Sequence, residues 1–522
     1  MTDGAEFEKP AYFITTPIYY VNDNPHIGHV YTTLACDVLA RFMRLDGRRV
    51  IFLTGTDEHG QKVERSAQAQ GMAPQAFTDR MSQNFRELSA SWQFSNDDFI
   101  RTTEARHVRS AQALWQRLKD NGQIYLGAYA GWYAVRDEAF YSEDELTRGE
   151  DGQMYAPSGA VADWVEEPSY FFRLSEWQDR LLDLYQRNPD FIGPEARRNE
   201  VISFVKSGLR DLSISRTTFS WGIPVPDDPD HIMYVWLDAL TNYITAVGYP
   251  ETESELFRAF WPADLHMVGK DILRFHAIYW PAFLMAAGVE PPKRVYAHGW
   301  WTNEGQKISK SLGNVIDPYD IIEQYGLDQV RYFMLREVPF GNDGDFSHRA
   351  IVGRINNDLA NDFGNLGQRV LSMIHKNCEG AVPEPGRLMA ADEALLNSSA
   401  ALLDRVRASL STQSFHTALE AIWEVVGEAN RYMEHTAPWI LRKTDRARMR
   451  TVLYVAAEVI RRLAILTQPF MPNGPAQLLD QMDQPRDERT FADLEQRLQP
   501  GRAIPKPKGV FPRYVEAEEQ KA

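Results

Sequence analysis

The spacing of hydrophobic residues predicts alternating strands and helices in the N-terminal part of the chain. Residues 11–16 form a short apolar run, and residues 48–55 form a longer run of the kind found in buried parallel strands. Between them, up to Gly47, a residue type that often ends a helix, apolar residues recur at helical spacing: Val30, Leu34, Val38, Phe42 and Leu45. A strand, a helix and a second strand in this order predict a right-handed βαβ unit.

Two stretches of α/β pattern are separated by an insertion. We expect the first half of a Rossmann-type nucleotide-binding domain over residues 1–125, where two more helical patterns follow the βαβ unit. The second half is expected over residues 223–300, with a strand at 264–269, a helical pattern from Lys270 and a strand at 294–301.

The insertion has a different sequence pattern. Residues 125–141 alternate and carry glycines and aromatic residues, as short antiparallel strands do, whereas residues 165–186 carry a helical pattern. We therefore expect an inserted connective subdomain over residues 126–222.

Strand patterns nearly vanish in the C-terminal part. Residues 301–355 contain the "KISKS" loop and are expected to form a stem-contact region. Four long helical patterns follow and predict an all-α bundle over residues 356–500. The tail, residues 501–522, is rich in Pro and then charged, so we expect it to be extended or partly disordered.

Composition narrows the class of protein. With 522 residues, 44% of them hydrophobic, the chain is long enough for several domains, and no apolar run spans a bilayer. The net charge of −16 argues against a broad, non-specific nucleic-acid binder but leaves room for a local basic face. The two cysteines, Cys36 and Cys378, exclude a disulfide framework and a zinc knuckle built from Cys. The acidic, polar start does not resemble a signal or transit peptide, so a cytoplasmic location is expected.

Two histidines lie where the first strand gives way to the first helix. Asn24 can cap that helix and Pro25 suits its first turn, so the N–H groups that follow would favour an anion. Gly28 would allow a phosphate or a purine close to the backbone, with His26 and His29 donating hydrogen bonds. On this motif alone, a metal site and ordinary surface histidines remain alternatives.

A second candidate phosphate site is the "KISKS" stretch. It places Lys307 and Lys310 three residues apart after Gly305, which suits a polyphosphate on a mobile loop. For an isolated short run, a solvated basic loop is the better interpretation. The α/β half-domain and the histidine motif before it favour the phosphate site instead.

"PHIGH" and "KISKS" are the two signatures of class I aminoacyl-tRNA synthetases. Further stretches resemble the methionyl-tRNA synthetases: "TTPIYYVNDNPHIGHVYT", "FLTGTDEHGQK", "YVWLDALTNYI", "GKDILRFHAIYWPA" and "HGWWTNEGQKISKSLGNV". This resemblance, which covers almost the whole chain, implies a Rossmann-type catalytic domain followed by an all-α anticodon-binding bundle. It implies a methionine–tRNA ligase, which makes methionyl-adenylate and pyrophosphate from methionine and ATP and then charges the 3′ end of initiator and elongator tRNA(Met).

The resemblance assigns ATP to residues from both halves of the catalytic domain. His26 and His29 would hold the phosphates, with Gly28 against the adenine, and Lys307 and Lys310 would stabilise the departing pyrophosphate. Two residues at the end of the strand at 264–269 would complete the site: Gly269, otherwise a plain loop glycine, and Asp271, a ligand of the ribose hydroxyls. Mg²⁺ is expected with ATP, but the sequence shows no dedicated ligand set for it.

Methionine is assigned an ammonium acceptor and an apolar slot. Asp57 would pair with the ammonium group, although alone it fits a helix cap equally well, and the carbonyl of Ile18 would add a second acceptor. Either Tyr20 or His276 would offer the sulfur a weak hydrogen bond. The resemblance outweighs the usual interpretation of aromatic residues as core and implies these side-chain contacts: Pro17, Tyr20, Trp236, Ala239, Tyr243, Ile272, His276 and Trp280.

The chain departs from the family at several positions. Leu240 stands where some members have Pro, a change between two apolar residues. The connective subdomain lacks the four cysteines that bind zinc in many members, so no structural zinc is expected. No appended oligonucleotide-binding domain, which often mediates dimerisation, follows the bundle, so a monomer is expected.

For tRNA, the resemblance implies that Asn361 and Trp439 contact anticodon bases. Asn365 stands where some members have Arg, and Arg369, one turn further on, would serve instead. Cations at residues 441–450 and 460–462 could contact the tRNA backbone or simply form a solvated helix face.

Other functions fit less well. Synthetases for branched aliphatic residues carry a large editing insertion that this chain lacks, and a cysteine-specific relative would use zinc-binding cysteines. A small nucleotidyltransferase that joins pantothenate to an amine would lack the bundle with Trp439. A non-catalytic tRNA-binding paralogue would not need both the histidine and the lysine motifs.

Overall fold

The computed structural model describes residues 9–22, 24–137, 139–308 and 313–516. They group into two compact units. We call residues 11–25 and 50–298 the sheet unit, and residues 26–49 and 299–516, with residues 9 and 10, the helical unit. None of the described helices is long and apolar enough to cross a membrane.

A parallel sheet forms the centre of the sheet unit. Its strands follow the order β10-β16-β15-β1-β3, with β2 and β4 also paired to β3, and the pairings of β15 with β1 and of β3 with β4 are parallel. The strands are β1 (Ala11–Thr15), β2 (Tyr19–Tyr20), β3 (Arg49–Asp57), β4 (Asp98–Arg101), β10 (Ile192–Gly193), β15 (Leu265–Gly269) and β16 (Val295–His298). The predicted strands at 11–16, 48–55, 264–269 and 294–301 are therefore confirmed.

Helices of the sheet unit pack with this sheet around one large apolar core. Its largest fully buried side chains include Trp115 on α4 and Trp280 on α9. The helices are α2 (Gln61–Ala69), α3 (Pro74–Ser91), α4 (Ala105–Asp120), α5 (Gln178–Arg187), α6 (Glu195–Lys206), α7 (Val235–Thr245), α8 (Glu255–Phe260), α9 (Trp280–Ala286), the short turns η1 (Glu143–Glu145), η2 (Leu174–Trp177) and η3 (Lys270–Ile272), and the π-helical turn η4 (Phe275–Tyr279). The helical patterns at 74–92 and 104–122 correspond to α3 and α4.

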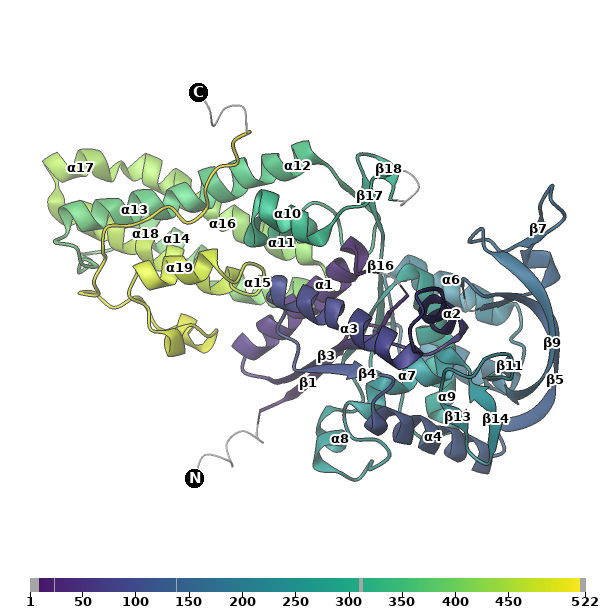
Figure 1. The fold of residues 1–522 in the computed structure, drawn as a ribbon. Helices are drawn as coiled ribbons and strands as arrows, with labels where there is room; N and C mark the ends of the chain where they lie inside the picture. The colour runs from purple at the N-terminus through teal and green to yellow at the C-terminus, as the bar shows by residue number, and fades with distance from the viewer. Residues whose placement is uncertain (1–8, 23, 138, 309–312, 517–522) are drawn as a thin grey trace. The chain divides into compact units, whose positions relative to one another are not determined.

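The insertion is built on a long antiparallel hairpin. Figure 1 shows β5 and β9 as a curved ribbon with β7 at its far end. The strands of the insertion and the small sheet beside it are β5 (Ile124–Ala134), β6 (Ala139–Tyr141), β7 (Thr147–Arg148), β8 (Met154–Tyr155), β9 (Val161–Phe172), β11 (Leu212–Ser213), β12 (Ser215–Arg216), β13 (Pro224–Val225) and β14 (Asp228–Met233).

One prediction for the insertion is wrong. The helical pattern at residues 165–186 belongs partly to β9, and only its second part forms α5. The first part is held as a strand by continuous pairing with β5, as between Leu126 and Tyr170, so tertiary pairing decided the local structure.

The helical unit contains the first long helix and the C-terminal bundle. Its elements are α1 (Ile27–Leu45), β17 (Trp301–Asn303), β18 (Gln306–Lys307), β19 (Gly344–Phe346), α10 (Pro318–Tyr325), α11 (Leu327–Arg336), α12 (His348–Gly353), the π-helical segment η6 (Arg354–Gly364), α13 (Asn365–Asn377), α14 (Ala390–Ala400), α15 (Leu402–Ser411), α16 (Phe415–Thr436), α17 (Pro438–Thr444), α18 (Arg446–Thr467), α19 (Gly474–Gln481), η7 (Arg486–Glu488) and η8 (Ala492–Glu495). The four predicted long helices are confirmed, although the first is divided between η6 and α13 and the second between α14 and α15.

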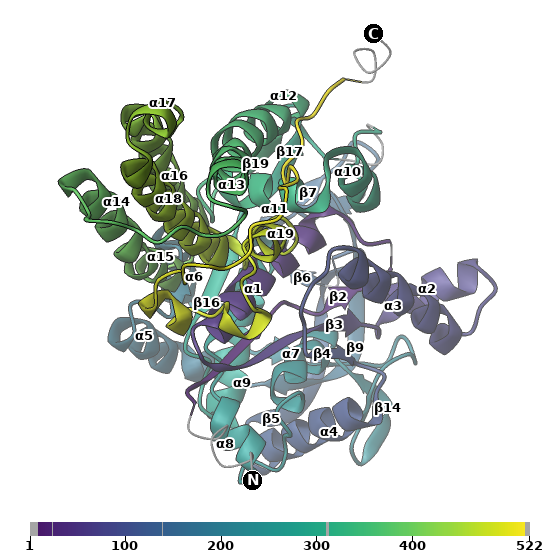
Figure 2. The ribbon, with the colours of Figure 1, turned by 90° about the vertical axis from the view of Figure 1, so that its left-hand side faces the viewer.

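Helix α18 is the axis of the bundle. All of its residues from Thr451 to Thr467 are buried, and α13, α14, α16, α17 and α19 pack against it. Figures 1 and 2 both show α16 beside α18. Every face of this stretch is buried because other helices surround it.

A buried ion pair ties α1 to the bundle. Arg331 on α11 donates to Asp37 on α1 at 2.7 Å, and both side chains are fully buried. The same guanidinium donates to the carbonyls of Pro469 and Phe470, just after α18. These bonds satisfy a charge that would be costly to bury alone.

The tail packs on the bundle as an extended segment. The N–H of Tyr514 donates to Oδ1 of Asn356 at 2.8 Å, and Nδ1–H of His375 donates to the carbonyl of Ile504 at 2.9 Å. Residues 501–516 contain no helix, which agrees with the expectation of an extended tail.

Candidate active site

His26 and His29 cap α1 reciprocally. His26 is the N-cap residue, and its Nδ1 accepts a hydrogen bond from the backbone N–H of Gly28 at 3.1 Å. The backbone N–H of His26 donates to Nδ1 of His29, also at 3.1 Å, and the two rings stack with their centroids 3.8 Å apart. Asn24, the predicted cap, instead accepts a hydrogen bond from Asn84. The prediction is wrong because imidazole supplied the acceptor that is usually provided by Asn, Asp or Ser.

This capping fixes the protons of both rings. A neutral imidazole whose Nδ1 accepts a hydrogen bond carries its proton on Nε2, so both rings are Nε2–H donors. Burial first, and then the electrostatic influence of the neighbouring His26, lowers the pKa of His29 well below its ordinary value. A side chain at Gly28 would lie only 3.0 Å from the His26 ring, so glycine keeps this helix start open. The result is a pair of N–H donors at the positive end of a helix, which suits an anion.

The lysine stretch begins in a hairpin. Lys307 lies in β18, is exposed and pairs with Thr302 in β17. The turn residues Glu304 and Gly305 both have positive φ, which the right-handed twist of a two-residue hairpin requires. Lys310 lies outside the described residues.

In the sheet unit, the ends of neighbouring strands bring Tyr20 and Asp57 side by side. The two residues are register partners in the pairing of β2 with β3. Asp57 is 7% exposed, and its carbonyl accepts a hydrogen bond from the N–H of Val21 at 3.2 Å. Pro17 and Ile18 lie between β1 and β2, the first buried and the second half-buried. Pro17, Ile18, Tyr20 and Asp57 thus occupy one edge of the parallel sheet.

The predicted side-chain pocket corresponds to an aromatic cluster. Trp236, Ala239 and Tyr243 lie on α7, and the rings of Trp236 and Tyr243 contact rings of the segment that follows β15. The ring of Trp236 stacks on Phe275 at 3.7 Å, and the Tyr243 ring lies 5.9 Å from that of Trp280. Ile272 ends the turn η3, one turn before His276, whose Nδ1 bonds to its carbonyl.

His276 has no proton left to offer a ligand. Its Nδ1–H donates to the carbonyl of Ile272 at 2.9 Å, and its Nε2 accepts from the hydroxyl of Tyr243 at 2.6 Å. Burial lowers the pKa of His276 to about 4, so the ring is neutral near pH 7. Of the two residues expected to donate to a thioether sulfur, His276 is therefore excluded as a donor, which leaves Tyr20.

The end of β15 carries the two remaining predicted ATP residues. Gly269 is the last residue of the strand, and Asp271 in η3 is exposed. A Cβ atom on Gly269 would lie 2.5 Å from Oδ1 of Asp271. Because Gly269 has no side chain, the carboxylate of Asp271 can lie close beside the end of the strand.

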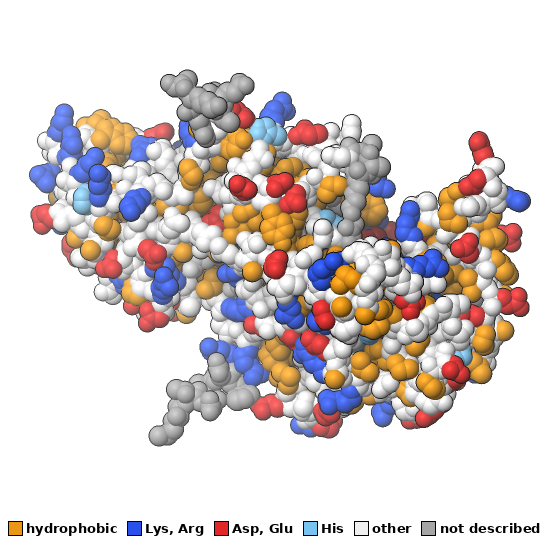
Figure 3. All heavy atoms as spheres, viewed as in Figure 1, with side chains coloured by type: hydrophobic (Ala, Val, Ile, Leu, Met, Phe, Trp, Pro, Cys, Tyr) orange, Lys and Arg blue, Asp and Glu red, His pale blue; other side chains and the backbone are white. Residues whose placement is uncertain are grey.

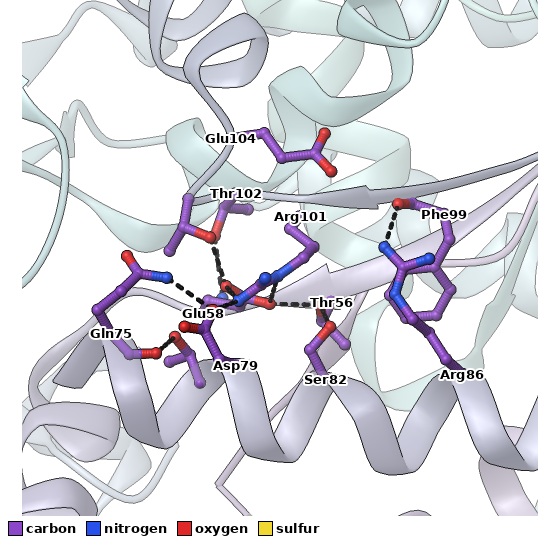
Figure 4. Close-up of polar contacts among 12 residues, drawn as sticks. Thr56, Glu58, Gln75, Asp79, Ser82, Arg86, Phe99, Arg101, Thr102 and Glu104 are labelled. Carbon is purple, nitrogen blue, oxygen red and sulfur yellow. Dashed lines mark hydrogen bonds and ion pairs between the residues drawn. The ribbon is translucent and has the colours of Figure 1, made fainter. Parts of the chain in front are cut away.

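Sequence analysis missed a polar network behind Asp57. Glu58 is fully buried, and its carboxylate accepts two hydrogen bonds from Arg101, at 2.7 and 2.9 Å, and one each from Thr56 and Thr103. Figure 4 shows how Arg101, from the end of β4, reaches across to Glu58 and to Asp79 on α3. The sequence feature that could have revealed this network is Glu58, a charged residue directly after a continuous apolar strand. A carboxylate can be buried at such a position only if its oxygens are paired.

The anticodon candidates lie on three elements of the bundle. Trp439 opens α17 and is 40% exposed, and the guanidinium of Arg369 on α13 lies 5.3 Å from the centre of its ring. Asn361, on η6, accepts a hydrogen bond from Arg513 of the tail. The structure thus brings Arg369 and Trp439 together and pairs Asn361 with a residue that sequence analysis did not consider.

The two predicted basic clusters differ. Arg461 and Arg462 are buried and both bond to Glu458, so the expectation that residues 460–462 could contact tRNA is wrong. Arg442 and Lys443 on α17 are exposed. Figure 3 shows Lys and Arg side chains gathered with hydrophobic ones at the end of the bundle that carries α17.

No group of three or more His, Cys, Asp or Glu that could hold a metal ion occurs within residues 9–22, 24–137, 139–308 and 313–516. The Nδ1 atoms of His26 and His29 both accept backbone N–H groups in the helix cap and are not available to a metal ion.

Comparisons with known proteins cover both parts of the chain. Residues 12–371 match the family model of class I tRNA synthetases (M), and residues 382–522 match that of the anticodon binding domain of methionyl tRNA ligase. The methionine–tRNA ligase of Brucella suis biovar 1 is 59% identical over 98% of this chain and 99% of its own length, and that of Rhizobium meliloti is 56% identical over 97% and 99%.

Solved structures agree. Mycobacterium tuberculosis methionyl-tRNA synthetase in complex with methionyl-adenylate has a TM-score of 0.95 and 54% identity, over 97% of this chain and all of that one. The free form of the M. tuberculosis protein has a TM-score of 0.90 and 52% identity, over 98% of this chain and 99% of that one.

Proposed function

The chain belongs to the methionyl-tRNA synthetases of class I, and on that premise we propose which of its residues carry out methionine–tRNA ligation. In the first step the carboxylate of methionine attacks the α-phosphate of ATP, and methionyl-adenylate and pyrophosphate form. In the second step the methionyl group passes to the 3′ end of initiator or elongator tRNA(Met). The first step needs positioning and charge stabilisation more than covalent help.

For ATP, the Nε2–H groups of His26 and His29 donate to phosphate oxygens as negative charge develops. The tautomer of both rings, fixed by the helix cap, is the observation that supports this role most directly. Gly28 lies against the adenine, and Lys307 and Lys310 neutralise the pyrophosphate as it leaves.

Gly269 and Asp271, at the end of β15, and Mg²⁺ complete the proposed ATP site. Gly269 leaves room beside the carboxylate of Asp271, and that carboxylate accepts hydrogen bonds from the ribose hydroxyls. Mg²⁺ accompanies ATP by binding its phosphate oxygens.

For methionine, Asp57 pairs with the ammonium group and the carbonyl of Ile18 accepts a second hydrogen bond. The thioether enters the aromatic cluster, where Tyr20 donates a hydrogen bond to the sulfur. The hydrogen-bonded pair of Tyr243 and His276 forms a polarisable surface of the pocket and offers the ligand no hydrogen-bond donor. The other residues proposed to line this pocket are Pro17, Trp236, Ala239, Ile272 and Trp280.

For tRNA, Trp439 stacks on an unpaired anticodon base, and Asn361 and Arg369 form hydrogen bonds with anticodon bases. Exposed cations such as Arg442 and Lys443 contact the backbone. From the family resemblance we further propose a cytoplasmic monomer without structural zinc.

Amino-acid-dependent exchange of labelled pyrophosphate into ATP tests the proposed specificity. We expect exchange with methionine and, among the twenty standard amino acids, with no other at comparable concentration. Exchange with leucine or cysteine but not methionine would refute the specificity. Exchange with none of them would indicate a tRNA-binding paralogue.

A further inference from the structure

A buried histidine–aspartate–histidine bridge joins three segments of the sheet unit. Asp238, on α7, is fully buried, and its two carboxylate oxygens accept hydrogen bonds from Nδ1 of His59 and Nε2 of His107, both at 2.7 Å. His59 follows β3, and His107 lies on α4. The bridge therefore links the end of a central strand to two helices that are distant in sequence.

The protons of the bridge follow from its geometry. A carboxylate can only accept, so His59 carries its proton on Nδ1 and His107 on Nε2. Burial alone would raise the pKa of Asp238, but the charge of His59 and the hydrogen bonds from both histidines lower it to about 2. Asp238 is thus an anion at neutral pH with both oxygens occupied.

The segment that contains His59 is held from several sides. The carbonyl of Glu58 accepts a hydrogen bond from Nε1–H of Trp221 at 2.6 Å, and the N–H of Gly60 donates to the carbonyl of Trp221 at 3.0 Å. The side chain of Glu58 is bound to Arg101 in the network of Figure 4. Of these anchors, only the bond from His59 to Asp238 reaches α7.

The joined segments carry different parts of the proposed methionine site. Asp57, the proposed ammonium acceptor, lies two residues before His59. Trp236, Ala239 and Tyr243, which line the proposed side-chain pocket, lie on α7 with Asp238. The bridge thus connects the segment that would hold the amine with the helix that would line the end of the side chain.

We propose that Asp238 is a positioning residue that sets this separation, and thereby the length of the unbranched amino-acid side chain that the enzyme activates. This inference rests on the proposed function, in which Asp57 binds the ammonium group and α7 lines the pocket. Asp238 itself does not touch the substrate. It acts through His59 on one side and through the backbone of α7 on the other.

The experiment measures pyrophosphate exchange with three amino acids: methionine, S-ethylhomocysteine, which is one methylene longer, and S-methylcysteine, which is one methylene shorter. Asp238→Ala should change the ratio of kcat/KM between methionine and at least one analogue by about tenfold, since one methylene in a fitted pocket contributes about that much discrimination. The KM for ATP should stay within about twofold of the wild-type value, because Asp238 bonds to none of the residues proposed to bind ATP.

Asp238→Asn is the conservative variant. Its Oδ1 can accept from His59, and its amide can donate to His107 once that ring moves its proton to Nδ1, which lies 3.3 Å from Oγ1 of Thr245. We expect it to keep the wild-type selectivity. Ser110→Ala is the matched control, because it removes a buried hydrogen bond from α4, to the carbonyl of Tyr249, without touching the bridge.

The possible outcomes distinguish the positioning role of Asp238 from the proposed role of Asp57 in binding the ammonium group. If Asp238→Ala lowers kcat/KM equally for all three amino acids, or if Ser110→Ala shifts the ratios as much, Asp238 is only structural and the proposal fails. If Asp57→Asn leaves the KM for methionine unchanged, the proposed function of Asp57 fails instead. Should Asp238→Ala not fold, His59→Leu breaks the same link while Asp238 keeps His107, and unchanged ratios in that variant overturn the proposal.

Discussion

The hydroxyl of Tyr243 donates to Nε2 of His276 at 2.6 Å, and the other nitrogen of that ring donates to the carbonyl of Ile272. Both protons are committed inside the protein. Tyr243 and His276, two buried side chains of the proposed methionine pocket, therefore present no hydrogen-bond donor to a ligand. Such an environment favours a thioether over a hydroxyl or an amide, which would lose hydrogen bonds on entering it.

Tyr243→Phe should weaken both the fold and methionine binding. The change leaves Nε2 of His276 buried without a donor, which lowers the free energy of unfolding by about 1–3 kcal/mol. We expect the KM for methionine in pyrophosphate exchange to rise, because the His276 ring loses the bond that fixes it. Urea denaturation and exchange kinetics measure the two effects.

Tyr185→Phe is the control for that change, since the Tyr185 hydroxyl is also buried and donates to the carbonyl of Ala277 at 2.7 Å. It should lower stability without raising the KM for methionine. An equal rise of KM in both variants would mean that Tyr243 acts only through stability.

His276 should remain neutral across the working pH range. Burial lowers its pKa to about 4, against about 6.5 in an unfolded chain. The unfolded chain binds the proton more readily between these values, so the stability associated with His276 is complete above about pH 6.5 and falls as the pH is lowered toward 4. Nitrogen NMR of labelled histidine, assigned with His276→Gln, should show a neutral ring at pH 5. A midpoint near 6.5 in the folded protein would contradict the buried geometry.

Lys310→Ala should slow adenylate formation by about a hundredfold or more while the KM for methionine changes little, as expected for a charge used mainly in the transition state. Lys307→Ala should act in the same direction, and less strongly. Single-turnover formation of methionyl-adenylate gives the rate. Lys508→Ala, an exposed cation of the tail, is the control and should have no effect. An equal loss in rate and in methionine binding would remove Lys310 from its proposed role.

Trp439→Ala should weaken the charging of tRNA without changing the formation of methionyl-adenylate. Loss of a stacked base contributes about 1–3 kcal/mol, so kcat/KM for tRNA(Met) should fall by about tenfold or more while methionine-dependent exchange stays unchanged. The neighbouring Ile440 is 56% exposed and offers no aromatic face, so Ile440→Ala should leave charging near the wild-type level. Equal charging by both variants would exclude Trp439 as the stacking residue.

Zinc should be absent from the purified protein in stoichiometric amounts. The two cysteines lie at positions 36 and 378, outside the connective subdomain. Dialysis against a zinc chelator should leave the midpoint of thermal unfolding unchanged. One zinc per chain by elemental analysis would show that other ligands replaced the cysteines.

The sequence determined the family and, outside the insertion, most of the strands and helices. Apolar spacing located β1, α1 and β3 because the buried positions of a strand or a helix recur with the period of that element. Gly47 follows the end of α1 as expected and has a positive φ of 80°. "PHIGH" and "KISKS" identified the family because phosphate chemistry restricts residue types locally. These features depend on neighbours within a few positions along the chain.

Only the tertiary structure decided which polar atoms are paired. Residues 165–172 became part of β9 because β5 lay opposite, and Arg461 became a buried partner of Glu458 although its sequence context resembled a solvated face. His276 is excluded as a donor to the thioether sulfur because its Nε2 accepts a hydrogen bond from Tyr243, and Asp238 meets His59 and His107 from distant segments. A hydrogen-bond partner that comes from far along the chain leaves no periodic trace in the sequence, because burial and pairing of a polar group are decided only when the segments pack.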